Sequence, residues 1–204
     1  MTPLAATGRR RPRGAATKQA ILDAAMELYA MRGFRGTGLI AIGQRAGVTH
    51  AGVLYHFGSA RDLLLAVIDE RDRRLWRETA GTWEGLEGLN ALRWLPTVAR
   101  WNDENRELAK LFTVLQAENL QGDDEGAHEF FVRRRRRVRG RLLRAIRQGR
   151  QRGEIRRDID ADTKADEIVA FMEGAQLTAL LDPRVDLVGL FESYTETLIR
   201  DLAA

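Results

Sequence analysis

The sequence contains no cysteine, only four prolines and no apolar stretch near 18 residues. Without cysteine, neither a disulfide nor a thiolate metal site can form, and a reducing compartment fits this composition. A membrane-spanning helix needs a longer apolar run, so none is expected. The basic N-terminus also lacks the apolar segment of a secretory signal. We therefore expect a cytoplasmic protein that does not interact with membranes.

Residue types that usually carry catalysis are scarce. Serine occurs only as Ser59 and Ser193, and neither lies in a nucleophile motif. The three histidines are not spaced as a metal-binding set. Gly33, Gly36 and Gly38 follow an expected helix, not the strand that precedes a phosphate-binding loop. We expect no catalytic residue, no metal and no cofactor.

Positive charge is concentrated at the N-terminal end of the chain. Residues 1–60 hold eight basic and two acidic residues, a net charge of +6, whereas the rest of the chain carries −2. Such an excess at one end favours an anionic partner, most often nucleic acid. A basic tail that only aids solubility would give the same composition, so charge alone leaves both interpretations open.

Apolar residues recur at helical spacing, and no segment alternates long enough to form a strand, so we expect an all-α protein. Residues 1–14 mix arginine with proline and glycine, which is typical of a disordered basic arm. A first helix is expected from residue 16 or 17 to Gly33. We assign residues 15–60 to one domain and residues 61–204 to a second helical domain.

The second domain shows six further apolar helix faces. The first of these helices is expected from Ser59 to about Gly81, and Arg71 falls on its apolar face. Pro96 predicts a kink or an early turn. Residues 153–162 are expected to form a loop before the last two helices.

Residues 38–57 are expected to form a helix-turn-helix, two short helices joined by a tight turn and backed by a longer helix. The turn needs small residues, which Ala46-Gly47-Val48 supplies, and Gly47 permits the left-handed backbone. Ile42 and Val48 are expected to pack inside. In such a unit the second helix enters the major groove and its N-terminal side chains contact base edges.

The candidate DNA contacts are the basic arm, the N-terminus of the first short helix, and exposed positions on and just after the second. Backbone N–H groups at a helix N-terminus and basic side chains both attract phosphate. The predicted contacts are Arg9, Arg10, Arg11, Arg13, Thr37, Gly38, Arg45, Thr49, His50, Ala51, Gly52, Tyr55, His56, Ser59 and Arg61.

The segment from about Lys18 to Ile68 resembles the DNA-binding region of the tetracycline-repressor (TetR) family. Order and spacing agree across roughly fifty residues. The matching residues are Ile21, Ala24, Ala25, Leu28, Gly33, Phe34, Thr37, Ile42, Ala46, Gly47, Val48, Thr49, His56, Phe57, Ser59, Leu63 and Leu64.

The sequence departs from the family pattern at several positions. The family usually has Ala at the position of Gly43, Gly at Ala51, Tyr at Leu54 and Lys at Ala60. Tyr55 lies one place after the usual phosphate-contacting tyrosine. These departures leave the fold expectation intact but weaken the case for phosphate contacts at Leu54 and Ala60.

The resemblance implies a sequence-specific regulator, a repressor that a small-molecule effector releases from a palindromic double-stranded operator. It also implies that the C-terminal domain holds the effector. Four tryptophans, Trp94 among them, fall in helices that would surround such a pocket. The predicted pocket residues are Trp76, Trp83, Trp101, Phe112, Gln116, Asn119, His128, Phe131, Met172 and Gln176.

The resemblance further implies a homodimer built from the last two helices, residues 163–181 and 185–202. Both helices are apolar on wide faces and carry small residues that permit close approach. The predicted interface residues are Ile168, Met172, Ala175, Ala179, Leu187, Phe191, Tyr194 and Leu198. The alternative is that these faces form the internal core of one chain.

Arg133–Arg137 is a run of five arginines. On a helix such a run covers all sides, so at least one arginine points toward Phe131 and Val138. A phosphate or acidic ligand is one interpretation, and we favour the other, solvated side chains paired with acids such as Glu129.

Other classes of protein remain open. The arm and Arg133–Arg137 would also suit a non-specific DNA-binding protein. An enzyme with a pocket in the C-terminal helices is a further alternative, since helical enzymes need not carry a motif. An activator, or a regulator without an effector, would share the fold of the expected repressor.

Overall fold

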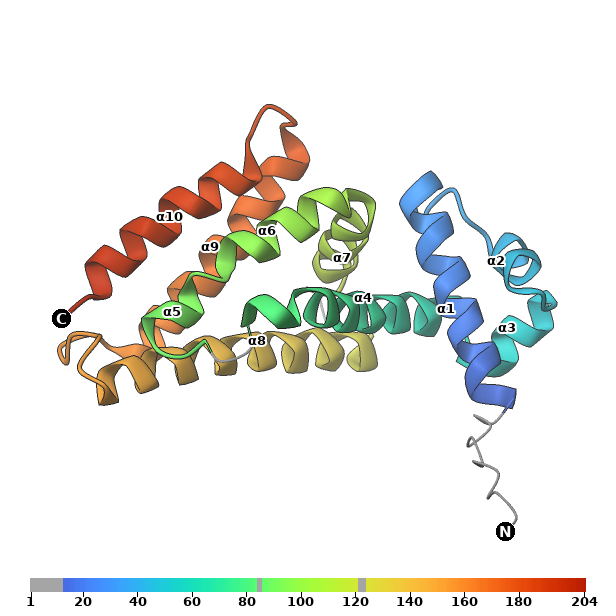
Figure 1. Cartoon of the computed structure of the whole chain (residues 1–204). Coiled ribbons are helices and arrows are strands. Elements are labelled where there is room, and N and C mark those ends of the chain that lie inside the picture. The colour runs from blue at the N-terminus through green and yellow to red at the C-terminus, as the bar shows by residue number, and fades with distance from the viewer. Residues whose placement is uncertain (1–12, 84–85, 121–123) are drawn as a thin grey trace, which may run out of the picture. The chain divides into compact units, whose positions relative to one another are not determined.

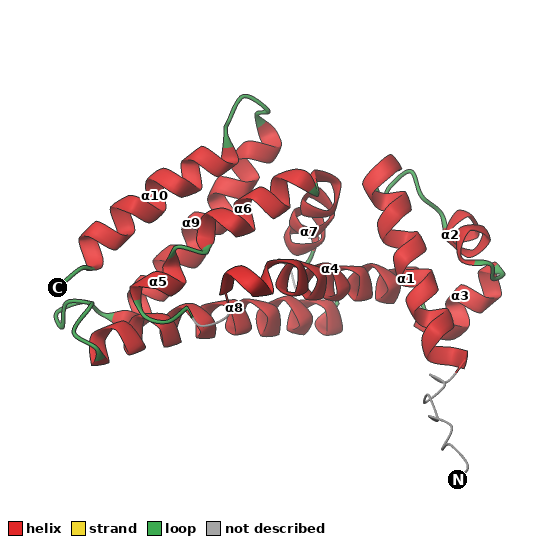
Figure 2. Ribbon diagram, in the orientation of Figure 1, coloured by secondary structure: helices red, strands yellow, loops and turns green. Residues whose placement is uncertain are grey.

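The computed structural model describes residues 13–83, 86–120 and 124–204, which form helices joined by short loops (Figure 2). Apart from an isolated bridge between Ile155 and Ala203, these residues contain no strand, so the all-α expectation is confirmed. The chain divides into an N-terminal unit that ends at Val67 and a C-terminal unit that begins at Ile68.

The N-terminal unit consists of α1 (Arg13–Arg32), α2 (Leu39–Ala46), α3 (His50–Phe57) and the start of α4 (Ala60–Trp83) (Figure 1). Helices α2 and α3 lie within residues 38–57, where the helix-turn-helix was expected. The arm predicted for residues 1–14 lies mostly outside the described residues, but its last two positions belong to α1. The helix expected from residue 16 or 17 therefore begins earlier, at Arg13.

Buried side chains from all four helices form the core of this unit, and α2 packs against both α1 and α3. The core residues with almost no exposed surface are Ile21, Ala25, Ile42, Val53, Leu63 and Val67. In α1 and α4 the two named residues are four positions apart, which is the spacing that places side chains on one face.

The C-terminal unit contains the rest of α4 and six further helices. These are α5 (Leu89–Leu92), α6 (Leu95–Glu104), α7 (Arg106–Glu118), α8 (Glu125–Gln151), α9 (Ala161–Leu181) and α10 (Leu187–Leu202). The break expected near Pro96 is a separation into two helices, with the proline in the first turn of α6, where no N–H is needed. Figure 1 shows these helices with their labels.

Within this unit, α8 packs against α5 and α9, and α10 packs against α6 and α9. The shared core includes Leu92, Leu95, Ile146, Ile155, Ala165, Ile168, Phe191 and Leu202. Aspartates cap three of the helices: Asp124 accepts a hydrogen bond from the Ala127 N–H, Asp160 from the Asp162 N–H and Asp186 from the Gly189 N–H. Each cap satisfies a backbone donor that the helix itself leaves unpaired.

Over the described residues, no single helix has the length and apolarity needed to cross a membrane. The pair formed by α3 and residues 60–79 of α4 reaches that length and composition only together, and it is bent at the break between them.

The turn between α2 and α3 leaves no room for a side chain at Gly43. A Cβ atom there would lie 2.8 Å from the Val48 carbonyl oxygen and 3.3 Å from the Thr49 carbonyl oxygen. This close approach gives a physical reason for the departure from the family's usual alanine. Backbone atoms cannot rotate away as a flexible side chain can.

We expect Gly43→Ala to lower the free energy of unfolding of the N-terminal unit by about 1–3 kcal/mol, because the turn must shift. Hydrogen exchange of the α2 and α3 amides measures this loss. Gly14→Ala is the control, because a Cβ atom there meets nothing within 4 Å. Equal protection in the two variants would contradict the tight packing.

Candidate DNA interface and effector pocket

The turn of the helix-turn-helix is held by glycine geometry and two backbone hydrogen bonds. Gly47 has a φ of 71°, in the left-handed region that favours glycine. Its N–H donates to the Gln44 carbonyl at 3.3 Å, and the Val48 N–H donates to the Gly43 carbonyl at 2.8 Å. Ile42 is buried as expected, whereas Val48 is half-buried. The turn fixes the start of α3.

Helix α3 keeps one face in the core and the other in solvent. Val53 and Phe57 are buried, whereas Tyr55 is 86% exposed. Thr49 caps the helix, because its hydroxyl accepts a hydrogen bond from the Gly52 N–H at 3.1 Å. His50 and Ala51 are exposed beside it. The first turn of α3 therefore offers its side chains outward, as a helix that reads base edges must.

Two predicted contacts on α3 are less open. Gly52 and His56 are half-buried. The His56 ring also packs edge-on against Tyr55, with ring centroids 5.3 Å apart. The exposed surface of α3 is therefore carried mainly by Thr49, His50, Ala51 and Tyr55.

The N-terminus of α2 lies at Gly38, which has an extended backbone and no side-chain cap. Thr37 does not cap α2, because its hydroxyl donates to the Gly33 carbonyl at the end of α1, at 2.9 Å. The backbone N–H groups of the first turn of α2 therefore have no side-chain acceptor at Gly38. Such groups attract phosphate.

Two of the other predicted contacts already have partners within the unit. Arg45 pairs with Glu27 at 2.8 Å, so a phosphate would have to compete with that carboxylate. The Ser59 hydroxyl accepts from the Asp62 N–H and donates to the Asp62 carboxylate, which makes it the cap of α4. Arg61 is half-buried. Arg9, Arg10 and Arg11 lie outside the described residues, and Arg13 is the first residue of α1.

Sequence reasoning missed two features of this unit. The Lys18 ammonium lies 5.1 Å from the centroid of the Phe57 ring, which places a positive charge beside the end of α3. Ile40, in the first turn of α2, is 64% exposed. The helical spacing of Ile40 and Ile42 could have shown that they face different sides.

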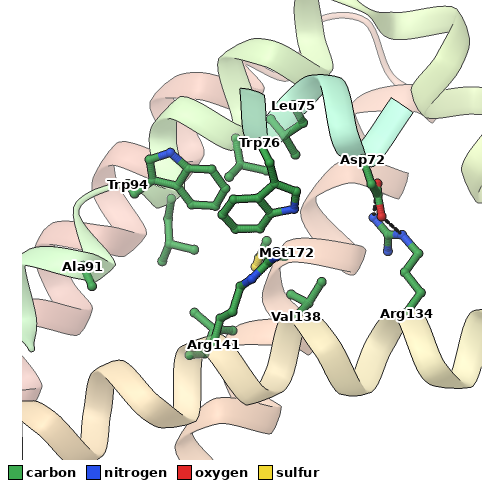
Figure 3. A pocket seen from close by; sticks show the side chains of 12 residues that line it. Asp72, Leu75, Trp76, Ala91, Trp94, Arg134, Val138, Arg141 and Met172 are labelled. Carbon is green, nitrogen blue, oxygen red and sulfur yellow. Dashed lines mark hydrogen bonds and ion pairs between the residues drawn. The ribbon is translucent and has the colours of Figure 1, made fainter. Parts of the chain in front are cut away.

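The C-terminal unit contains an apolar cavity of about 60 Å³ whose lining comes from α4, α5, α6, α8 and α9. Trp76 and Trp94 stack with centroids 4.5 Å apart. The polar groups at the cavity are Asp72, Arg134 and Arg141, as Figure 3 shows. Two further hollows, of about 200 and 220 Å³, share residues with this cavity and include Arg141.

Of the predicted pocket residues, only Trp76 and Met172 line this cavity. Phe112 and Gln176 line a second hollow of about 60 Å³, together with Met172. The side chain of Trp83 lies outside the described residues.

The other described residues of the pocket prediction line neither this cavity nor the hollows named above, and they have partners or face solvent. Trp101 is buried and donates to Glu78, and Asn119 is buried and donates to the Leu115 carbonyl. Gln116 donates to Glu173, and Phe131 packs on Phe112. His128 is exposed, with Nδ1 3.2 Å from the Asn119 carbonyl oxygen.

A fully buried arginine lies next to the cavity. Arg71 is 1% exposed, and its guanidinium donates to Asp72 at 2.9 Å and to the Asn102 side-chain oxygen. Asn102 in turn donates to Gln176 at 2.9 Å, and Gln176 donates to Thr113 at 2.9 Å. This polar chain connects α4 with α6, α9 and α7 through the apolar interior.

Burial and neighbouring charges act on the two central groups in opposite ways. Burial lowers the pKa of Arg71 to about 10, partly offset by the Asp72 carboxylate. Burial would raise the pKa of Asp72, but the guanidinium groups of Arg134 and Arg71 outweigh it and hold that pKa below its usual value. At neutral pH the cluster therefore contains two guanidinium cations and one carboxylate.

The run Arg133–Arg137 is mostly engaged within the unit. Arg134 binds Asp72 through two hydrogen bonds of 2.7 and 3.0 Å and lies 4.0 Å from the Phe112 ring centroid. Three of the others pair with acids at up to 3.8 Å: Arg133 with Glu129, Arg135 with Asp166 and Arg137 with Asp69. Arg136 is exposed. The favoured interpretation, pairing with acids, agrees with these contacts.

Six of the eight predicted dimer-interface residues lie in the core of their own chain. Ile168, Ala175, Ala179, Leu187, Phe191 and Leu198 are all buried. Met172 lines the cavity, and Tyr194 stacks on Phe171. The apolar residues that α9 and α10 do expose are Leu177, Leu181 and Leu190.

Among the described residues, no group of three or more histidine, aspartate or glutamate side chains is placed to hold a metal ion. What the geometry defines is a helix-turn-helix with an open recognition helix, joined by α4 to a helical unit with a cavity. These are the features of a DNA-binding regulator.

Comparison with known proteins identifies the family. Residues 21–67 match the model of bacterial regulatory proteins of the tetR family, and residues 101–202 match the C-terminal model of BetI-type transcriptional repressors. The second match alone spans half of the chain. The chain therefore belongs to the TetR family of transcriptional regulators.

Individual relatives are similar over part of the sequence or in fold. The regulator RutR of Escherichia coli K12 is 42% identical over 62 residues, which are 30% of this chain and 29% of RutR. A regulator from Saccharomonospora viridis, solved with choline, has a TM-score of 0.72 at 20% identity and covers 93% of this chain and 99% of its own. FadR from Bacillus subtilis, solved with stearoyl-CoA, has a TM-score of 0.69 at 22% identity and covers 90% and 98%. At such identities the structures show the fold.

We expect Asp72→Asn to lower the free energy of unfolding of the C-terminal unit by about 3 kcal/mol at pH 7, because it leaves buried guanidinium groups without a carboxylate. The folded-state pKa of Asp72 is depressed, so this stability is present above the unfolded pKa of about 4 and is lost as pH falls through the folded pKa. The difference between wild type and variant should shrink below pH 4.

Urea unfolding followed by tryptophan fluorescence at pH 7, 5 and 3 measures both effects. Asp103→Asn is the matched control, because its ion pair with Arg106 is 53% exposed at the aspartate and exposed pairs contribute about 1 kcal/mol or less. A constant difference between wild type and Asp72→Asn over the whole pH range would contradict the assignment.

Proposed function

We propose that this regulator is a repressor that binds a near-palindromic operator as a homodimer, in the cytoplasm, and leaves it when a small molecule binds the C-terminal unit. The observation that carries the proposal is the exposure of the first turn of α3, where Thr49, His50 and Tyr55 face solvent while Val53 and Phe57 hold the helix in place. The exposed side chains supply base readout, and backbone groups and basic residues supply phosphate contacts.

An exposed face of α9 supports a homodimer. Along α9, the exposed Ala170, Gly174, Leu177 and Leu181 recur at steps of three or four residues and so share one face. Gly174 carries no side chain, and a Cβ atom there would meet nothing within 4 Å. A small residue with apolar neighbours permits close helix approach in a bundle. Two copies would then read half-sites roughly 34–36 Å apart, or a multiple of that spacing.

Release by a small molecule is supported by the continuity of α4. This helix begins at Ala60, directly after α3, and continues in the C-terminal unit to Asp72 and Trp76 at the cavity. A ligand shifts the balance only by the difference in its affinity for the two arrangements. The S. viridis and B. subtilis structures were solved with small molecules, which supports the same use of this fold.

Selection of random DNA duplexes on the full-length protein tests this function. We expect a two-fold symmetric motif, and we expect His50→Ala to lose preference at one symmetric pair of positions, because each base contact contributes about 1–3 kcal/mol of discrimination. Ser193→Ala, exposed on α10, is the control and should select the wild-type motif. Binding without any preferred sequence would support the non-specific DNA-binding alternative.

The basic arm makes a separate prediction. Replacement of Arg9, Arg10, Arg11 and Arg13 by alanine should weaken DNA binding and reduce the slope of log affinity against log salt, because each phosphate contact releases a counterion. Titration of a labelled duplex at four salt concentrations measures the slope. An unchanged slope would show that the arm does not contact DNA.

A further inference from the structure

Arg141 brings a positive charge to the cavity without a carboxylate of its own. Its guanidinium lies 3.4 Å from the centroid of the Trp76 ring, and no described carboxylate lies within ion-pair distance of it. The side chain is half-buried. It borders the cavity and both adjoining hollows. Figure 3 shows it reaching from α8 toward Trp76.

The nearest acid is already neutralised. Asp72 accepts two hydrogen bonds from Arg134 and one from Arg71, so the carboxylate at the cavity serves two guanidinium groups. Burial lowers the pKa of Arg141, and the positive charges of Arg137 and Arg144 lower it further, against the opposing effect of the Asp72 carboxylate. The charge that remains unbalanced at the cavity is positive.

The other walls are apolar. Trp76 and Trp94 stack on each other, and Leu75, Val98, Val138, Leu142 and Met172 complete the lining. The cavity alone, at about 60 Å³, is too small for a drug-sized molecule, which needs about 300–1,000 Å³. A larger ligand would also have to use the hollows of about 200 and 220 Å³ that share lining residues with it. A molecule that spans them passes Arg141.

We propose that the effector is an organic anion, with an apolar body that fills the cavity beside the tryptophan pair and a carboxylate that pairs with Arg141. This inference rests on the proposed function and names the ligand class of that site. The pairing would give Arg141 the anionic partner that the chain does not provide, with two parallel hydrogen bonds from the guanidinium fork.

The same observations disfavour a quaternary ammonium ligand, although a choline-bound regulator shares the fold. Cations are recognised by free aromatic faces and nearby acids. Here the Trp76 ring already carries the Arg141 guanidinium and stacks on Trp94, and Asp72 is occupied by arginines. A ligand cation would meet Arg134 and Arg141 with no free carboxylate to offset them.

A matched set of three probes separates charge from shape. These are 2-naphthoate, its neutral carboxamide and the 2-naphthyl trimethylammonium cation, each titrated calorimetrically into the full-length protein without DNA. We expect the carboxylate to bind at least about tenfold more tightly than the amide, as charge-assisted hydrogen bonds predict. Binding of the cation should be weakest.

Variants then locate the charge. Arg141→Met keeps an apolar stem of similar length and should weaken 2-naphthoate at least about tenfold while leaving the amide within about twofold. Arg141→Lys keeps the charge but loses the fork, so its affinity for 2-naphthoate should lie between those of the wild type and Arg141→Met. Arg136→Met, which removes one exposed charge from the same helix away from these hollows, should change neither probe by more than about twofold.

Tighter binding of the cation than of the carboxylate would overturn the proposal, as would equal binding of all three probes or no binding by any of them. Equal losses in Arg141→Met and Arg136→Met would also overturn it, because they would show a diffuse charge effect. None of these results bears on the DNA selection, so failure of the anion inference and failure of the regulator function remain distinguishable.

Discussion

The guanidinium of Arg71 is the buried charge on which the C-terminal unit depends. Burying an ion costs several kcal/mol unless its partners are well placed. Asp72, the next residue on α4, and Asn102 of α6 must therefore both reach this guanidinium. Asp72 then holds Arg134 of α8, and Asn102 holds Gln176 of α9. Arg141 lies seven residues after Arg134 and so on the same face of α8, which places its charge at Trp76. The structural cluster and the proposed effector site are therefore built on one another.

The N-terminal unit is organised by local rules instead. A left-handed glycine, a threonine cap and a serine cap set where α2 ends and where α3 and α4 begin, and a few buried apolar residues fix the helices against one another. Hardly any long-range polar contact is needed, so the outward face of α3 is free for sequence readout. Because α4 belongs to both units, the helix that carries the ion cluster is also the helix that follows the recognition helix.

This contrast explains what could be read from the sequence. The spacing of Ile42, Gly47 and Thr49 defines the helix-turn-helix because each acts within a few residues of itself. The sequence also indicated Arg71 as a basic residue on an apolar helix face. Its partner Asn102 is 31 positions away, and nothing in the sequence pattern identifies that partner. Periodicity likewise showed that α9 and α10 have apolar faces. It could not show that Ile168 and Phe191 are covered by their own chain, because a face looks the same whether core or partner covers it.

Thermodynamic linkage provides the most direct test of the account, since an effector that weakens DNA binding must itself be weakened by DNA by the same factor. The measurement is the affinity of the full-length protein for its selected duplex, with and without saturating 2-naphthoate, together with the affinity for 2-naphthoate with and without the duplex. The account predicts that both affinities fall by one common factor of about ten or more. Unchanged affinity for the duplex while 2-naphthoate occupies the protein would contradict it.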